Sequence, residues 1–170
     1  MNYSKTFIGN EIITLVNEEG YLYPQISIKD YVESYFTSKE TFGKKEVEPG
    51  HWFFQCYDFE AKQRYNNEIV AVEISEYSGA ITVFSGSYYN KEIALVGDPE
   101  ITVKNVLSKK ILQVPLRLVS KWKDMYKLSV NDNNTNLWDN IDIDQYPYQG
   151  KVYTIITKTT NQFNANNIVL

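Results

Sequence analysis

The sequence has little cysteine, little histidine and no long apolar run, and each shortage excludes a class of protein. Cys56 is the only cysteine and His51 the only histidine among the 170 residues. No internal disulfide can form, and a structural zinc site with four Cys or His ligands is excluded. No stretch reaches the roughly eighteen apolar residues of a membrane span, and the start lacks the basic and apolar regions of a secretory signal. We therefore expect a cytoplasmic protein that does not contact a membrane.

Motifs of the common catalytic classes are missing as well. The chain has no glycine-rich phosphate loop, no G-x-S-x-G elbow and no H-E-x-x-H pair, which lowers the expectation of a nucleotide enzyme, a hydrolase or a zinc protease. His51 and Cys56 lie five residues apart on one expected strand, so their side chains point to opposite faces and do not form a catalytic pair. We expect no cofactor, no bound metal and no catalytic residues, and a binding protein rather than an enzyme.

The composition that is present is that of one globular domain. Hydrophobic residues make up 43% of the chain and charged residues 22%, while aromatic residues reach 15% because of fourteen tyrosines. A chain of this length buries a core without disulfides or metals, and no repeat or linker divides it. We expect a single domain over residues 1–170, with the amide-rich end, 161–170, frayed.

The spacing of apolar residues predicts an α+β fold. Helical spacing follows the N-terminus, and Ser27 with Asp30 resembles a capping box. Period-two alternation further on predicts an antiparallel sheet of four to five strands, with a hairpin turn at 77–79. One or two further helices are expected to pack on one face of the sheet. The expected helices are 4–16, 28–38 and one or two between 99 and 129, and the expected strands are 51–57, 68–76, 80–85 and 151–157.

Charge is segregated along the second half of the chain. Residues 104–127 carry seven basic residues and one acid, whereas residues 128–150 carry four aspartates and no base. Acidic and aromatic side chains together are typical of a protein-binding surface, with aromatic anchors and charges that steer association. We therefore predict an inhibitor or immunity-type protein that neutralises a bacterial toxin by covering the active site of a more basic partner. The predicted contacts are Trp138, Asp139, Asp142, Asp144, Tyr146 and Tyr148.

Two other functions stay open at this point. One is a small-ligand or carbohydrate-binding or hydrolytic domain with a pocket lined by aromatic residues, in which Asp142 and Asp144 form a carboxylate pair. The other is a nucleic-acid accessory protein, although a net charge of -4 argues against binding to phosphates. The basic and acidic segments could also dock on each other, and the oligomeric state is open. The basic side chains proposed for nucleic acid are Arg117, Lys121, Lys123 and Lys127.

A calcium loop is the one metal site that the spacing suggests. Asp132, Asn134 and Asn136 alternate as the first ligands of such a loop do. However, Leu137 stands where glycine is needed and Ile143 where the last acidic ligand is needed. The segment is therefore predicted to be a solvated turn.

One segment resembles a known family of binding domains. The hairpin Ile69 to Phe84, with Glu-Ile-Ser-Glu-Tyr-Ser-Gly at its turn, resembles one repeat unit of small hairpin-and-helix domains such as PepSY. The resemblance covers about a tenth of the chain and implies no site residues. As a whole, a compact, acidic, tyrosine-rich chain of this size is similar in profile to bacterial immunity proteins.

Overall fold

The chain folds as a mostly β structure. The computed structural model describes residues 2–23, 25–88, 92–132 and 135–170, with the backbone alone over 131–132 and 135–136. Strands account for 58% of the chain and helices for 9%, and twelve of the strands join in one sheet. The predicted α+β fold with a sheet of four to five strands is therefore wrong.

The elements follow one another along the chain with short helices between long runs of strands. Two α-helices of six residues and one 3-10 turn lie within the described ranges: α1 (Ile28–Glu33), α2 (Leu116–Lys121) and η1 (Lys123–Met125). The strands are β1 (Tyr3–Phe7), β2 (Ile12–Ile13), β3 (Leu15–Val16), β4 (Ile26–Ser27), β5 (Gly43–Glu46), β6 (Phe53–Asp58), β7 (Gln63–Gly86), β8 (Glu92–Val96), β9 (Glu100–Asn105), β10 (Ile111–Pro115), β11 (Tyr126–Asp132), β12 (Thr135–Thr157), β13 (Asn164–Ala165) and β14 (Ile168–Val169).

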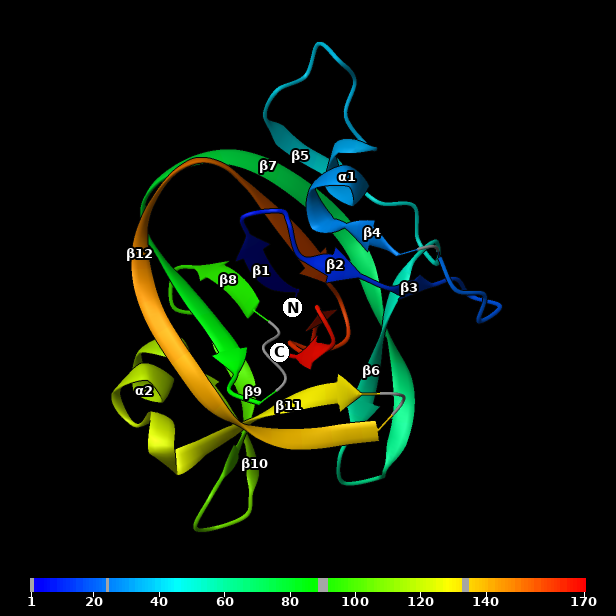
Figure 1. Cartoon of the computed structure of the whole chain (residues 1–170). Coiled ribbons are helices and arrows are strands. Elements are labelled where there is room, and N and C mark those ends of the chain that lie inside the picture. The colour runs from blue at the N-terminus through cyan, green and yellow to red at the C-terminus, as the bar shows by residue number, and fades with distance from the viewer. Residues whose placement is uncertain (1, 24, 89–91, 133–134) are drawn as a thin grey trace.

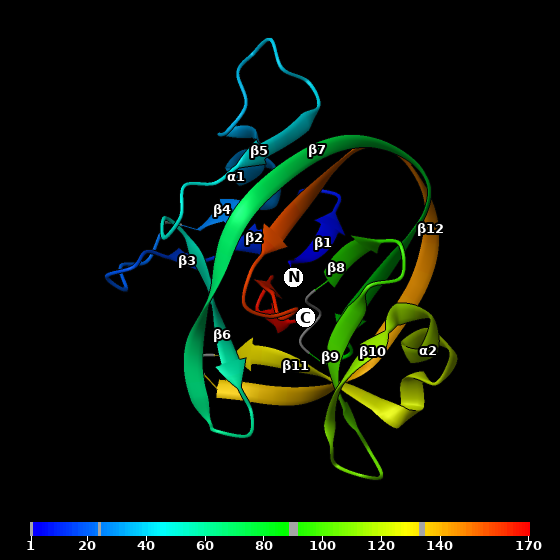
Figure 2. The same cartoon turned by 180° about the vertical axis from the view of Figure 1, so that it is seen from behind.

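Two very long strands form the frame of the molecule. β7 has 24 residues and β12 has 23, and they pair antiparallel from Ile69 opposite Thr157 to Gly86 opposite Ile141. The two strands bend together around the centre of the molecule, and both ends of the chain lie inside that bend (Figures 1 and 2). The right-handed twist of β-strands lets a long ribbon wrap in this way.

The remaining strands close the frame from both sides. The sheet runs in the order β10-β9-β11-β12-β1-β8-β7-β6-β3, and β12 also pairs directly with β7. β1 lies between β12 and β8, with Tyr3 opposite Thr157 and Phe7 opposite Leu95. β14 pairs with β11 and β13. The first and the last strands of the chain therefore both belong to the interior of one sheet system.

Aromatic and β-branched side chains from distant segments fill the centre. Phe7, Phe54 and Phe163 are fully buried, and the Phe163 ring centre lies 6.4 Å from that of Phe7 and 5.3 Å from that of Phe54. Tilted ring pairs at these distances stabilise a core beyond the area that they bury. The last segment of the chain thus contributes a central core residue.

The N-terminal helix predicted over 4–16 is instead the strands β1, β2 and β3. The odd-numbered residues from 5 to 15 are all buried, which is the period of a strand. Three of these inward residues are Lys5, Gly9 and Glu11, so the apolar residues alone imitate helical spacing. The polar character of the inward face hides the alternation.

The hairpin predicted at 77–79 is also wrong, because β7 continues straight through it. Gly79 pairs with Tyr148 and Tyr77 with Gly150 on β12, so a partner strand is present where a turn was expected. The segment after 99 forms β9 and β10, which pair antiparallel from Glu100 opposite Pro115 to Lys104 opposite Ile111. A helix follows only from Leu116 to Lys121.

The second predicted helix begins where the capping pattern places it. Ser27 is the N-cap of α1, and its side chain accepts a hydrogen bond from the backbone N–H of Asp30. The helix ends at Glu33 rather than at 38. It buries Ile28, Tyr31 and Val32.

The end of the chain is packed into the core in place of a frayed tail. Phe163, Ala165, Ile168, Val169 and Leu170 are all buried. The amide side chains that suggested fraying instead hydrogen-bond to the interior backbone, as described below. Within the described ranges, no helix has the length and apolar character needed to cross a membrane.

Candidate functional site

The two end segments of the chain meet in the interior, and buried polar side chains gather at that place. Lys5 on β1 is 1% exposed. Its Nζ atom donates hydrogen bonds to the backbone oxygen of Asn161 and, at 3.1 Å, to Oδ1 of the same residue. The nitrogen also lies 4.6 Å from the centre of the Phe163 ring. We call Lys5, Cys56, Asn67, Asn161 and Gln162 the end-segment site.

Asn67 on β7 holds the irregular segment that follows β12. Its Nδ2 atom donates to the backbone oxygens of Thr160 at 2.9 Å and Gln162 at 2.8 Å. Its Oδ1 atom accepts from the backbone N–H groups of Thr159 at 3.1 Å and Thr160 at 3.2 Å. Irregular backbone inside a protein needs partners for its polar groups. The Asn67 side chain makes four hydrogen bonds to this backbone, as a neighbouring strand would do in a sheet.

Cys56 on β6 also forms a hydrogen bond to the segment that follows β12. Its thiol donates to the backbone oxygen of Gln162 at 3.3 Å, the oxygen that also accepts from Asn67. Burial raises the pKa of the Cys56 thiol to about 12, so the thiol stays protonated at neutral pH. A carbonyl oxygen that accepts two hydrogen bonds inside a protein is polarised, and such donors stabilise negative charge that develops on oxygen.

Lys5 is the most unusual group in the site because a lysine is rarely fully buried. Burial lowers the pKa of Lys5 to about 7, against weaker opposing effects of Cys56 and Glu100. None of the ion pairs among the described residues includes Lys5. A large fraction of this amine is therefore uncharged at neutral pH, and an uncharged amine is a nucleophile and a base.

A pair of hydroxyl groups lies next to Lys5 on the other face of β1. Thr6 and Thr154 are opposite each other in the β1–β12 pairing, and their Oγ1 atoms are 2.7 Å apart. Both side chains are half-buried. The hydroxyls can pass a proton between them because each is both a donor and an acceptor.

A second connection between the end segments lies near β2. Asn166 accepts a hydrogen bond at its Oδ1 atom from the backbone N–H of Ile12 at 2.7 Å, and its own backbone N–H donates to the Ile12 oxygen at 2.8 Å. Its Nδ2 atom donates to the backbone oxygen of Glu92 at 2.6 Å. Asn166 has a φ of 48°, a conformation that asparagine tolerates better than most residues.

These groups together suit acyl transfer. The site holds an amine that is partly uncharged, carbonyl groups that accept side-chain hydrogen bonds, and a hydroxyl pair, all near the place where the two ends of the chain meet. Lys5, Asn67 and Gln162 are buried among core side chains, where electrostatic interactions are stronger than in water. The electrophiles nearest to the nucleophiles are amide groups of the chain itself.

The structure separates the residues expected to contact a partner protein. Asp142, Asp144, Tyr146 and Tyr148 occupy alternate positions of β12 and so share one face, on which the first three are exposed. Asp139 is 8% exposed. Only four of the six expected contacts therefore form one surface.

Asp139 and Trp138 instead have structural roles. The Asp139 carboxylate accepts hydrogen bonds from the backbone N–H groups of Tyr88 at 2.9 Å and Asn140 at 2.8 Å. The centre of the Trp138 ring lies 5.1 Å from that of the Phe59 ring, and the Nζ atom of Lys104 lies over the Trp138 ring, 5.5 Å from its centre. That last contact joins the basic and the acidic segments, but the ion pairs of the described residues do not link them.

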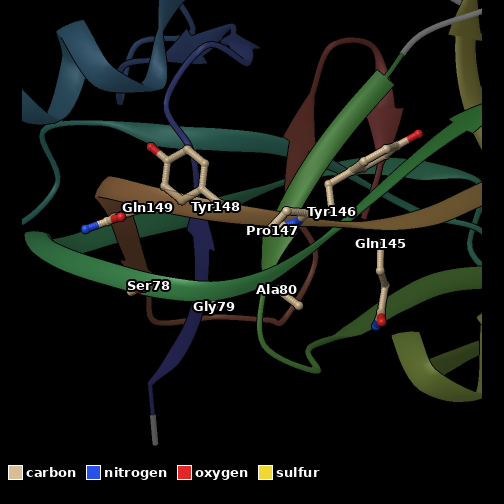
Figure 3. A pocket seen from close by; sticks show the side chains of 8 residues that line it. All are labelled: Ser78, Gly79, Ala80, Gln145, Tyr146, Pro147, Tyr148 and Gln149. Atoms are coloured by element: carbon tan, nitrogen blue, oxygen red, sulfur yellow. The ribbon is translucent and has the colours of Figure 1, made fainter.

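A pocket lies at the bend of the long ribbon, where the small residues Ser78, Gly79 and Ala80 of β7 pair with residues 147–149 of β12. Figure 3 shows Tyr146 and Tyr148 on one side of β12 and Gln145 on the other. No ionisable carboxylate lines it, because Asp142 and Asp144 lie further along β12. The pocket lining is Ser78, Gly79, Ala80, Gln145, Tyr146, Pro147, Tyr148 and Gln149.

The basic residues proposed for nucleic acid come from three different elements. Arg117 and Lys121 lie on α2, Lys123 on η1 and Lys127 on β11. Arg117 forms an ion pair with Asp98, which reduces its availability to a phosphate. Trp122, which lies between Lys121 and Lys123, is 53% exposed.

The remaining sequence-based candidates stay isolated. His51 is exposed, and its ring stacks on that of Trp52 at 5.4 Å. Of the calcium-loop residues, Asn134 lies outside the described residues, and the side chains of Asp132 and Asn136 are not described. Among the residues whose side chains are described, no group of three or more His, Cys, Asp or Glu residues could hold a metal ion.

Sequence reasoning missed most of the end-segment site. Cys56 was considered only as the possible partner of His51 in a catalytic pair, and it is buried. Lys5, Asn67, Asn161 and Gln162 were not singled out, because each lies in a segment expected to be a helix, a turn or a frayed end. The available signal was the run Thr-Thr-Asn-Gln-Phe at 159–163, in which a phenylalanine suited to a core stands among polar residues.

Comparisons with known proteins agree on the fold. No family model matches the chain, and no curated protein matches it in sequence. Similar solved structures are inteins.

The PabCDC21-1 intein superposes with a TM-score of 0.76 at 14% identity, covering 97% of this chain and 96% of that one. An intein from a hyperthermophile gives 0.72 at 13% identity, covering 99% and 98%. A KlbA intein precursor from Methanococcus jannaschii gives 0.68 at 17% identity, covering 97% and 90%.

These similarities overturn the predicted function. Inteins are protein-splicing domains, and the similar structures include neither inhibitors nor immunity proteins. The immunity prediction is therefore wrong, and the ligand-binding and nucleic-acid alternatives gain no support. The likeness to PepSY domains also fails, because the hairpin on which it depended is part of one continuous strand. Over nearly its whole length, the chain has the fold of these inteins.

Proposed function

We propose that this chain is an intein-type domain that rearranges amide bonds of the polypeptide to which it belongs. A domain that excises itself and joins its flanks must bring its two ends together and act on amide groups beside them. The observation that carries the proposal is the meeting of both end segments in the centre of an intein fold (Figures 1 and 2). The substrate is then the chain itself, and no separate partner is needed.

The contacts of the end segments support this function. Lys5 binds Asn161, Ile12 binds Asn166, and the Phe7 and Phe163 rings pack together. Holding reacting groups side by side turns an intermolecular reaction into an intramolecular one, which accounts for a large part of many rate enhancements. The fold supplies that proximity before any reaction begins.

Three side chains are candidate nucleophiles or bases for such a reaction. They are the amine of Lys5, the hydroxyl of Thr6 and the thiol of Cys56. The Cys56 thiol is protonated at neutral pH and therefore suits hydrogen-bond donation better than attack. The Thr6 hydroxyl is half-buried and paired with Thr154, so it is the candidate that a flanking segment reaches most easily.

The experiment uses the natural polypeptide that carries this chain, with a different affinity tag at each end. We expect a product of lower mass that carries both tags, together with the released chain, when intact masses are followed over time. If both flanks stay attached after prolonged incubation at several pH values, the proposed function is wrong. A cytoplasmic location, proposed from the lack of disulfides, sets reducing conditions for this test.

Separate variants assign the nucleophile. Thr6→Val removes the hydroxyl and preserves the shape of the side chain, Lys5→Met removes the amine, and Cys56→Ala removes the thiol. Lys158→Arg is the matched control, since Lys158 lies close in sequence to Asn161 but is exposed. We expect the control to process like the parent and the nucleophile variant to remain unprocessed. Circular dichroism of each variant separates loss of chemistry from loss of fold.

A further inference from the structure

Lys5 and Asn161 are held in direct contact inside the protein. The Lys5 nitrogen is 3.1 Å from Oδ1 of Asn161, and Oδ1 is bonded directly to the carbonyl carbon Cγ. The Lys5 nitrogen is also held by the backbone oxygen of the same residue. Two hydrogen bonds to one residue hold the amine next to the Asn161 side chain, so the two groups are kept close together.

The surroundings of the pair favour an uncharged amine. Burial is the cause, and it outweighs the face of the Phe163 ring, 4.6 Å from the nitrogen, and the charge of Glu100, both of which favour the protonated amine. The ionisable groups that act on Lys5 are Cys56 and Glu100. Cys56 is held in its protonated form by burial, so it does not supply the negative charge that would keep Lys5 protonated. An amine in such a place loses its proton readily.

We propose that Lys5 and Asn161 join in an intramolecular amide bond between Lys5 Nζ and Asn161 Cγ. This cross-link goes beyond the proposed function and does not rest on it, because it needs only the folded chain.

The reaction balances without any other reagent. The lone pair of the uncharged Lys5 nitrogen attacks Asn161 Cγ, and the electrons of the carbonyl bond move to Oδ1. A proton passes from the attacking nitrogen to Nδ2, the bond between Cγ and Nδ2 breaks, and the carbonyl re-forms. One amide replaces another, and ammonia leaves. No oxidant, metal or nucleotide is consumed.

The cross-link would connect parts of the chain that are far apart in sequence. Lys5 and Asn161 are 156 residues apart, so the covalent loop would include almost the whole chain. A covalent bond that closes a long loop restricts the unfolded state and thereby stabilises the folded one. Joining β1 to the segment after β12 would also keep the two end segments together whether or not the flanks of the chain are processed.

Mass spectrometry of the whole, unmodified chain tests the proposal directly. We expect the intact mass to be lower than the sequence mass by one ammonia molecule. Trypsin should then release residues 1–29 joined to residues 159–170, because an amidated Lys5 is no longer a cleavage site and because Lys29 and Lys158 are the flanking ones. Fragmentation of that joined peptide should place the bond at Lys5 and Asn161.

Variants separate the cross-link from other losses of ammonia. Lys5→Met and Asn161→Ala should each have their full sequence masses, and Lys158→Arg should lose ammonia as the parent does while preserving the trypsin site. A cyclic imide formed by an asparagine alone also releases ammonia, but it would persist in Lys5→Met. Loss of ammonia in Lys5→Met would therefore contradict the proposal.

The decisive contrary result needs no variant. If the parent chain, folded and incubated at neutral and mildly alkaline pH, has its full mass and yields a free peptide that ends at Lys5, the cross-link does not form. That result would leave the processing of the flanks untouched. Conversely, a cross-linked chain with unprocessed flanks would contradict only the proposed function.

Discussion

Tyr77 and Tyr148 stand at equivalent positions of the long ribbon, and each closes over the glycine two residues further along its own strand. The Tyr77 hydroxyl donates to the backbone oxygen of Ala80 at 2.7 Å, and the Tyr148 hydroxyl donates to that of Lys151 at 2.7 Å. Across the ribbon, Tyr77 is opposite Gly150 and Tyr148 is opposite Gly79. The two strands therefore share one local arrangement at the bend.

Removing either hydroxyl should weaken the ribbon at its bend. Tyr148→Phe and Tyr77→Phe each lose one hydrogen bond, and we expect losses of about 0.5–1.5 kcal/mol in the free energy of unfolding. The Tyr148 bond is partly buried and the Tyr77 bond is exposed, so Tyr148→Phe should cost more. Urea unfolding measures both. A larger loss in Tyr77→Phe would contradict the idea that shielding from water sets the strength of these bonds.

Gly9 should not tolerate a side chain. Its φ is +110°, and an added Cβ would lie 2.7 Å from the Tyr153 ring and 3.0 Å from the Lys29 Cβ. Backbone strain and overpacking both apply, so Gly9→Ala should lose roughly 2–5 kcal/mol of unfolding free energy. Gly20→Ala is the control, because Gly20 also has a positive φ, +84°, but has no atom within 4 Å of the added Cβ. Equal losses in thermal unfolding would show that the contact with Tyr153 is unimportant.

Asn67 should be far more important for stability than its neighbour Asn66. Asn67→Ala leaves buried backbone groups of the segment 159–162 without partners, and we expect a loss of about 3 kcal/mol or more. Asn66→Ala, at an exposed position, should change the unfolding free energy by less than about 0.5 kcal/mol. Hydrogen exchange adds a local measurement. The amides of Thr159 and Thr160 should lose protection in Asn67→Ala and keep it in Asn66→Ala.

The free amine of Lys5 should make stability depend on pH. Its pKa is about 7 in the folded chain and 10.5 in the absence of burial. Between these values the unfolded chain binds more protons than the folded chain, so the unfolding free energy rises with pH, by at most about 1.4 kcal/mol per pH unit. The range from pH 7 to 8 isolates the effect, because the opposing effect of the Cys56 thiol, whose pKa is about 12 in the folded chain and 9.0 without burial, grows only as the pH approaches 9.

The variant Asn161→Ala provides the clean background for that measurement, since its Lys5 cannot be cross-linked. Denaturant unfolding at several pH values should show the positive slope, and the double variant with Lys5→Met should not. A parent chain with the Lys5–Asn161 bond should also lack the slope, because an amide nitrogen does not titrate in this range. The same slope in both variants would assign it to other groups.

Local features could be predicted from the sequence better than the arrangement of the strands in the sheet. The capping of α1 at Ser27 follows from local chemistry, and it was predicted correctly. The N-terminal strands were hidden because Lys5, Gly9 and Glu11 occupy inward positions. Glu11 is satisfied there by the backbone N–H of Gly9 at 3.0 Å, and burial raises its pKa. The spacing of apolar residues cannot reveal an inward face that contains charged residues and glycine.

The long ribbon illustrates a second limit. Tyr77, Ser78 and Gly79 favour a turn locally, but pairing with β12 across the whole length of β7 stabilises the extended form. That pairing is between residues far apart in the sequence, and propensity does not encode it. For the same reason, the amide-rich segment 161–170 was predicted to be frayed, although Asn67, Lys5 and Cys56 donate hydrogen bonds to its backbone from three other strands.

The state of the Lys5 nitrogen is the most direct test of the claim that Lys5 and Asn161 join in an amide bond. We would record the nitrogen NMR spectrum of the full chain labelled with ¹⁵N at the lysine side chains and ¹³C at the asparagine side chains. The account predicts one lysine nitrogen with a single attached proton and a direct coupling to an asparagine side-chain carbon, absent in Asn161→Ala. A Lys5 nitrogen that remains an amine and titrates with a pKa near 7 would contradict it.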